Sequence, residues 1–486
     1  MRSLCAIIGM GLLAELACAQ GPVLLSPPQV PRGDAVVSIS LGEALTMAGS
    51  KPLDIAIATQ QVEVARKRYD LAKVMWVPNL SVGGDYFHHE GLQQNFAGEI
   101  LKSSRSTAMV GVGPNILFNS SELLFAPRIT AKELAARQAM QTATVNDLSL
   151  MVAEAYFEVQ RGRAELAGAE LGVRQADELN RRAEALAEGL SPPLEATRAR
   201  VELARRKQFA ATAKERWRVA SAELGRLLRL DPPGCLVEPA EPPFLTVTLI
   251  DPASSVDSLV PVALQNRPEL QAHQAVVEAT LQRLKQERWR PLLPSLAVRS
   301  VSTNPSGSIG YGAFAGGPGG RIGGGGQRFD VDVQLMWEFS NLGFGNKART
   351  GERKAENFAA MLELFRTQDR IAAEVATEYA RLKAAAERLA LAEPAAKDSI
   401  DLVEKSLIGL AQTRRIGDTI TLVVRPQEAV AAVQSLGQAT NDYAAAAADF
   451  NRAQFRLYRA LGHPACALPN AMPPVNVPEP PKALAP

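Results

Sequence analysis

The chain has 486 residues, of which 47% are hydrophobic and 21% are charged, and its formal net charge is +2. This balance excludes an intrinsically disordered protein and shows no sign of a nucleic-acid partner. Only 5% of the residues are aromatic, which suits long helices packed through small side chains better than one large globular core. The length allows two to four domains.

The first residues, 1–19, have the features of a secretory signal peptide. Arg2 gives a positive end, Leu4 to Leu16 is mostly apolar, and Ala17-Cys18-Ala19 resembles a cleavage site. Cys18 could instead be a lipidated first residue, although the residues before it make a poor lipobox. No later apolar run is long enough for a transmembrane helix, so we expect an exported protein that crosses any membrane through β-strands.

One stretch, FDVDVQLMWEFS at residues 329–340, alternates apolar and polar side chains and is about as long as one tilted bilayer crossing, roughly 9–11 residues. We predict a membrane strand with these lipid-facing residues: Phe329, Val331, Val333, Leu335, Trp337 and Phe339. The predicted residues of the water-filled lumen, from this and two other strands, are Asp85, Arg299, Asp330, Asp332, Gln334 and Glu338. The alternative is a half-buried strand of a soluble sheet.

The chain divides into two similar halves, residues 39–230 and 255–462. They are flanked by a Pro-rich tether (20–38), a Pro-rich linker (231–254) and a Pro-rich tail (463–486). In the first half we expect helices at 41–48, 52–75, 127–189 and 194–230, strands at 79–86 and 108–118, and a loop at 88–103.

The second half repeats this order with closely similar spacing. Pro52 and Pro78 are 26 residues apart, as are Pro268 and Pro294. We expect helices at 255–265, 268–294, 347–416 (kinked at Pro394) and 420–461, a strand at 295–298, a Gly-rich loop at 304–327 and the alternating strand at 329–340. Four membrane strands cannot close a barrel and open edges are not tolerated in lipid, so copies must combine.

At this point the sequence resembles the TolC family of outer-membrane efflux proteins. The resemblance rests on the doubled junctions PLDIAIATQQVEVARKRYDLAKVMWVPNLSV and PELQAHQAVVEATLQRLKQERWRPLLPSL, and on the helix breaks EGLSPPLEATRAR and IGDTITLVVRPQEAV. It covers roughly residues 39–462. It implies an α+β membrane protein, a homotrimer whose twelve strands close one outer-membrane β-barrel, continued by a periplasmic α-helical barrel.

The resemblance also implies partners and sites. The duct would receive cargo from a periplasmic adaptor and an inner-membrane pump, in efflux or type I secretion, and would contact outer-membrane lipid. Cargo stays open between drugs, metal ions and polypeptides. The predicted adaptor-docking rim, at the two helix breaks, is Gly189, Leu190, Ser191, Gly417, Asp418 and Thr419.

The family's acidic ring after the second break has no counterpart here, because the matching positions are Val423 and Pro426. In the first half the matching positions are Glu195 and Arg198. A periplasmic constriction would therefore depend on Glu195, Arg198 and Arg425, together with Asp418.

We predict no enzymatic activity, cofactor or metal site. His88-His89-Glu90 could bind a metal, but a solvated outer loop is the better interpretation. The run from Gly316 to Gly326 lacks the Lys-Ser/Thr of a phosphate loop. The rival hypotheses are a soluble periplasmic coiled-coil scaffold and a hydrolase with a helical domain. We also expect Cys235 and Cys466 not to form a disulfide.

Overall fold

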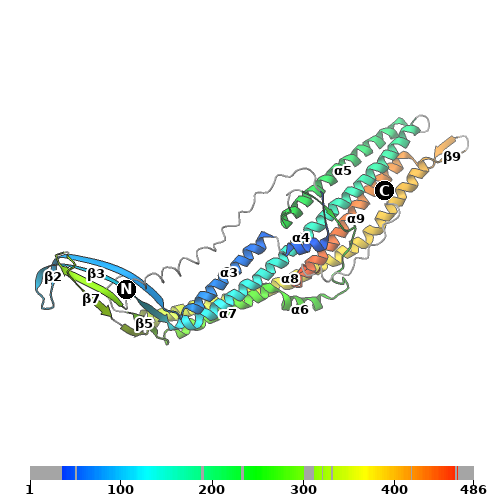
Figure 1. Ribbon diagram of the computed structural model, residues 1–486. Helices are drawn as coiled ribbons and strands as arrows, with labels where there is room; N and C mark the ends of the chain where they lie inside the picture. Colours follow the sequence, from blue (N-terminus) through cyan, green and yellow to red (C-terminus); the bar gives the residue numbers. More distant parts are fainter. Residues whose placement is uncertain are drawn as a thin grey trace.

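The structure is a computed structural model that describes residues 36–49, 52–187, 191–230, 235–242, 244–299, 311–319, 321–329, 332–416, 419–465 and 468. The molecule is long and narrow. Its main sheet lies at one end, and two helical hairpins reach the other end (Figure 1). Among the described helices, none combines the length and apolarity that a membrane crossing would need.

The elements follow the doubled order that the sequence predicts. In the first half they are β1 (Val36–Ile39), α2 (Leu41–Ala48), α3 (Leu53–Val74), β2 (Asn79–Gln94), β3 (Ile100–Asn119), α4 (Ser120–Leu186) and α5 (Pro193–Leu228). In the second half they are β4 (Leu236–Pro239), α6 (Val256–Asn266), α7 (Pro268–Trp289), β5 (Ser295–Arg299), β6 (Tyr311–Pro318), β7 (Gly324–Phe329), β8 (Asp332–Met336), η1 (Ser340–Gly343), α8 (Phe344–Leu410), β9 (Thr413–Ile416), β10 (Thr419–Leu422) and α9 (Pro426–Ala460).

The two longest helices, α4 and α8, each contain 67 residues. At 1.5 Å per residue each is about 100 Å long. The start predicted for the first of them after Pro127 was wrong, because α4 begins at Ser120 and Pro127 lies inside it. A proline there removes only the amide that would bond to Leu123 four residues earlier, a loss that one turn of a packed helix can absorb.

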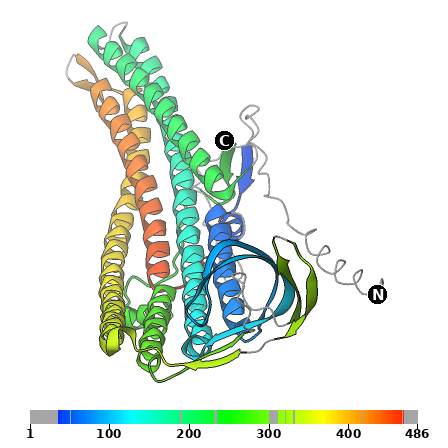
Figure 2. The same cartoon turned by 90° about the vertical axis from the view of Figure 1, so that its left-hand side faces the viewer.

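The main sheet has six strands but only four strand positions, which are called lines here, because two positions are each occupied by two shorter strands. β5 and β6 both pair with β3, and β8 and β7 pair with their other sides, so β5–β6 and β7–β8 each form one interrupted line. β2 pairs with the far side of β3. Figure 2, which looks onto the end of the molecule that carries the sheet, shows that these strands are strongly curved.

Three sequence-based expectations for this sheet were wrong. The expected loop at 88–103 is mostly strand, since β2 runs to Gln94 and β3 starts at Ile100. The Gly-rich stretch holds β6 and β7. The predicted strand at 329–340 ends at Met336, so Trp337 to Ser340 lie beyond it.

A compact turn explains why β2 and β3 extend so far. Asn95 accepts hydrogen bonds on its side-chain oxygen from the amides of Ala97 and Glu99, and Gly98 adopts a positive φ of 88°. Asn followed by Gly in this spacing is a turn signal, because Asn caps the backbone locally and Gly accepts left-handed angles. The alternation of the flanking residues can then continue up to the turn.

A small lateral domain packs against the middle of the helices. β1 and β4 form a parallel pair there, so both the predicted tether and the predicted linker contribute a strand. Trp217 of α5 donates its indole N–H to the carbonyl of Val237 at 2.9 Å, and Tyr156 of α4 donates to Glu241. Cys235 in this region is a buried free thiol, whereas Cys466 lies outside the described residues.

Helix α4 is the central element of the fold, since it packs on α3, α5, α7 and α9. Small residues allow the backbones of these helices to come close to one another. A Cβ at Gly162 would stand 3.0 Å from the Cα of Trp217 in α5, and one at Gly168 would stand 3.1 Å from the Thr440 hydroxyl of α9. These contacts fit the low aromatic content of the chain.

A buried ion network joins four helices close to the junction of α6 and α7. The Arg267 side chain is only 2% exposed and pairs with Glu374 of α8 and, at 3.4 Å, with Glu269. Arg459 of α9 contacts Glu374 at 2.6 Å, Glu269 at 2.9 Å and Asp147 of α4. Burial raises the pKa of the Asp147 carboxyl and lowers the pKa of the Arg267 guanidinium.

We expect Glu374→Ala to destabilise the protein by about 3–5 kcal/mol, because it leaves a buried guanidinium without its main counterion. The control is Glu363→Ala on the same helix, whose exposed partner Arg366 lies 3.3 Å away and whose loss should cost about 0–1 kcal/mol. Urea unfolding of both variants, followed by intrinsic tryptophan fluorescence, measures the difference. Equal midpoints would contradict a structural role for the network.

Candidate functional site

The sheet has two chemically different faces. Val82 lies opposite Val112, and Leu296 lies opposite Leu335, all on one face by strand alternation. Most of these side chains are strongly exposed, with Val82 at 74% and Leu335 at 58%. A wide exposed apolar surface on a sheet marks contact with something other than water.

The other face carries polar and small residues. Asp85 lies opposite Met109, and Gln334 lies opposite Ala297. Asp85 and Gln334 are therefore on the face away from Val333 and Leu335, as the sequence predicts, and both are half-buried. The assignment of this face to a lumen stays a prediction.

The remaining residues predicted for the two faces have different positions. Arg299 and Asp332 are backbone partners in the β5–β8 pair, and Phe329 is the partner of Tyr311. Asp330 and Val331 lie outside the described residues. Glu338, Trp337 and Phe339 follow the end of β8 and are exposed.

The far ends of the two hairpins are built differently. In the first, α4 ends at Leu186, whose carbonyl accepts the Ser191 amide at 2.9 Å, and Pro192 and Pro193 then begin α5. Gly189 and Leu190 lie outside the described residues. This end is a short helix-to-helix turn, as predicted.

The second hairpin ends in strands, which the sequence analysis missed. α8 stops at Leu410, well before Ile416, and β9 pairs with β10 in the register Thr419↔Ile416. Thr419 therefore belongs to a strand, while Gly417 and Asp418 lie outside the described residues. The signal was present in TRRIGDTITL, where β-branched residues flank a two-residue Gly-Asp connection that is typical of hairpins.

The predicted constriction residues gather at the start of the returning helices. Arg198 of α5 pairs with Glu195 at 2.7 Å and reaches Gln427 of α9 at 3.4 Å. Arg425 caps α9, where its amide donates to Glu428 at 3.4 Å. The structure thus brings Glu195 and Arg198 together and links them to the second hairpin through Gln427.

A second, buried link between the hairpins lies further from the ends and was missed by sequence reasoning. Glu202 of α5, with its side chain 2% exposed, pairs with Arg206 at 2.6 Å and accepts a hydrogen bond from Gln434 of α9 at 2.8 Å. A Cβ at Gly437 would collide with the Arg206 guanidinium. The absence of a side chain at Gly437 therefore makes room for the ion pair.

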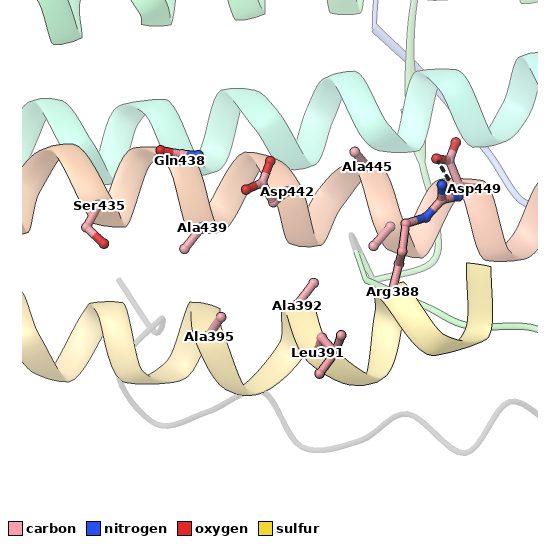
Figure 3. Close-up of a pocket in the computed structure, with 11 residues that line it drawn as sticks. Arg388, Leu391, Ala392, Ala395, Ser435, Gln438, Ala439, Asp442, Ala445 and Asp449 are labelled. Atoms are coloured by element: carbon pink, nitrogen blue, oxygen red, sulfur yellow. Dashed lines mark hydrogen bonds and ion pairs between the residues drawn. The ribbon is translucent and has the colours of Figure 1, made fainter. Parts of the chain in front are cut away.

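An open groove of about 650 Å³ runs between α8 and α9 (Figure 3). Its lining is mostly small, with Ala392 and Ala395 from α8 and Ser435 and Ala439 from α9. Arg388 pairs with Asp449 across the groove at 3.4 Å. Such a shallow, polar-edged surface suits the wall of a conduit better than a pocket for one small molecule.

The histidine motif is part of β2 and not of a loop. The Nδ1 atom of His88 lies 2.8 Å from the Ser106 hydroxyl, and its Nε2 atom lies 3.9 Å from Glu90. Within the described part of the chain, no group of three or more His, Cys, Asp or Glu side chains is arranged to hold a metal ion.

If the apolar face contacts lipid, Val333→Arg or Leu335→Arg should impair assembly, at a cost of about 2–4 kcal/mol near the bilayer midplane. The neighbour Gln334→Arg should be tolerated, because it would point into water. Yields of assembled protein in membranes give the measurement. Equal loss of assembly at all three positions would show that the assignment of Val333 and Leu335 to the lipid-facing side of the strand is wrong.

The comparisons with known proteins agree with this architecture. Residues 45–228 match the family model described as outer membrane efflux protein. No curated protein sequence matches the chain.

Solved structures share the fold over nearly the whole chain. MtrE of Neisseria gonorrhoeae, an outer-membrane channel in its open state, is 16% identical with a TM-score of 0.67, covering 92% of this chain and 96% of its own. VceC of Vibrio cholerae is 15% identical with a TM-score of 0.65, covering 87% and 96%. CmeC of Campylobacter jejuni, also an outer-membrane channel, is 13% identical with a TM-score of 0.66, covering 87% and 85%.

The family match covers the first half of the chain, and the structural likeness shows the fold of nearly the whole chain. Residues 45–228 are therefore similar to the outer membrane efflux proteins, and the chain shares the fold of solved outer-membrane channels over nearly its whole length.

Proposed function

We propose that three copies of the chain assemble into one duct that passes substrates from an inner-membrane pump and a periplasmic adaptor to the outside, in efflux or type I secretion. The observation that carries the proposal is the pairing of the outermost strands. Among the described strands, β2 has β3 as its neighbour, and the β7–β8 line has β5 and β6. Each of these two outermost lines thus has one edge without a strand partner among the described strands.

A strand edge without a partner has a high free-energy cost in a membrane. Each unpaired amide or carbonyl in hydrocarbon costs several kcal/mol, since no water is present to satisfy it. The β2 edge of one copy and the β8 edge of the next can satisfy each other. Three copies then close one barrel, with Asp85, Arg299, Asp330, Asp332, Gln334 and Glu338 proposed as its lumen lining.

Apolar seams on the outermost helices support the same assembly. On α3, the exposed residues Ile57, Val64 and Leu71 recur every seven positions. On α8, Phe358, Leu362 and Phe365 form a second exposed row, with Phe365 at 56%. Seven-residue spacing is the pattern of helices that pack along their length.

A further pair of seams lies nearer the periplasmic end. Leu194, Val201 and Phe209 are exposed along α5, and Leu391 and Leu402 are exposed along one face of α8. We therefore place α3 and α5 of one copy against α8 of the next. This arrangement covers the apolar rows that a single copy leaves in water.

The adaptor would dock at the ends of the hairpins, on the rim formed by Gly189, Leu190, Ser191, Gly417, Asp418 and Thr419. These ends lie at the opposite extreme of the molecule from the sheet (Figure 1). Because the sheet lies in the outer membrane, the ends point toward the inner membrane. The helical turn and the β9–β10 hairpin would alternate around the ring.

The constriction would lie just inside this rim. Arg198 pairs with Glu195 and reaches Gln427 of the other hairpin, two residues after Arg425. Widening the duct would require α5 and α9 to separate there, and the exposed Arg198–Gln427 contact is a weak link that makes this separation cheap.

We predict that Leu362→Asp with Phe365→Asp prevents trimer formation. Burial of one Leu or Phe is worth about 1.5–3 kcal/mol, and the carboxylates would have to be buried as well. Chemical cross-linking in membranes followed by denaturing electrophoresis reports the assembly.

The control for this seam is Glu363→Asp with Arg366→Lys, two exposed neighbours whose charges are retained. It should cross-link like the wild type. Trimers of normal yield in the Leu362/Phe365 variant would contradict the proposed interface.

For the rim, we expect Ser191→Trp or Thr419→Trp to leave the trimer intact in the outer membrane but to abolish export. A bulky ring on the rim blocks close approach of the adaptor. Lys214→Trp, on the exposed surface of α5, is the matched control and should export normally. The measurement is accumulation of a dye in cells that contain the partner adaptor and pump, and normal export by the rim variants would move the docking site elsewhere.

A further inference from the structure

Three of the four tryptophans of the chain lie where helices meet strands. Trp76 lies between α3 and β2, Trp289 ends α7 just before β5, and Trp337 follows β8 just before α8. All three are more than half exposed, at 58%, 52% and 54%. The fourth, Trp217, is buried and donates its N–H to Val237.

These tryptophans come from distant parts of the sequence but lie near one level of the molecule. Ser295 at the start of β5 pairs with Met336, the residue before Trp337, and with Asn119 at the end of β3. Trp337 directly follows the last residue of β8 and is exposed, as are Val333 and Leu335 of the apolar face. The apolar face therefore ends in an aromatic level on the helix side.

Basic side chains lie immediately on the helix side of this level. Arg288 precedes Trp289, and Lys347 and Arg349 are in the first turns of α8. All three side chains are exposed, and within the described part of the chain none of them forms an ion pair with a carboxylate. The exposed carboxylates Asp70 and Glu338 lie at a similar level, and Glu338 accepts a hydrogen bond from Ser340.

The chemistry of this layered surface matches the edge of a bilayer. Tryptophan prefers the headgroup level, because its ring is apolar and its N–H needs a polar partner. Lysine and arginine beside it extend their apolar stems along the surface and place the charge among phosphates. A protein partner would not require aromatic rings and cations in two separate layers.

We propose that this junction collar, formed by Trp76, Trp289, Trp337, Arg288, Lys347 and Arg349, binds the anionic phospholipid headgroups of the leaflet nearest the helices. The inference goes beyond the exit duct, because it names the lipid chemistry that fixes the depth of the barrel in the membrane. It rests on the outer-membrane location of the sheet but not on the number of copies.

The first test uses full-length protein in phosphatidylcholine–phosphatidylglycerol vesicles whose acyl chains carry bromine near the headgroup or near the bilayer centre. Variants keep one tryptophan each, with the others changed to Phe. Trp76, Trp289 and Trp337 should be quenched several-fold more by the shallow bromine, and Trp217 by neither. Stronger quenching by the deep bromine, or none at the three collar positions, overturns the proposal and would indicate a protein occupant in the second case.

The second test removes the charge. Arg288→Gln with Lys347→Gln and Arg349→Gln should reduce the phosphatidylglycerol retained on purified protein several-fold, as measured by mass spectrometry of extracted lipid. The matched control, Arg205→Gln with Lys207→Gln and Lys214→Gln on exposed positions of α5, should retain it fully. Equal retention by both triple variants overturns the proposal. Cross-linking of the same samples reports trimer formation separately, so failure of the assembly and failure of the collar can be distinguished.

Discussion

The constraint on which the whole structure depends is that backbone hydrogen-bonding groups cannot be left unpaired in hydrocarbon. The main sheet has four lines and two free edges among its described strands. One copy cannot close this sheet on itself without giving up the extended helices that follow each strand line. Neighbouring copies must therefore pair at the sheet edges. That pairing also sets which helices of one copy lie against the next copy.

Helix α4 connects the sheet to the far end of the molecule. It continues directly from β3, packs on α3 and α7 near the sheet, and packs on α5 and α9 further along. The buried network around Arg267 and Arg459 ties α4, α8 and α9 at the middle. Toward the far end, the Glu202–Arg206 pair and Gln434 link α5 to α9. Beyond these buried links, the exposed Arg198–Gln427 contact joins the hairpins at their ends, which suits a duct that opens there.

Much of this fold could be predicted from the sequence because the long helices are marked by proline and glycine breaks and the halves repeat. The alternation of Val333 and Leu335 with Gln334 also fixed their relative faces, since the side-chain period of a strand is two. The β9–β10 hairpin was missed because four-residue strands flanking Gly-Asp resemble a helix stop. The Gly-rich β6 and β7 have little side-chain pattern, so only pairing with β3 reveals them. The Glu202–Gln434 link joins residues 232 positions apart, which no local pattern can indicate.

The number of copies in one particle tests the account most directly. The mass of the purified full-length protein in detergent, measured by light scattering with the detergent contribution subtracted, should correspond to three chains. The free edges of β2 and β8 and the apolar rows of α3, α5 and α8 would then all be covered. A stable particle of one chain, still inserted in the membrane before extraction, would contradict the account, because its sheet edges would have to be satisfied in some other way.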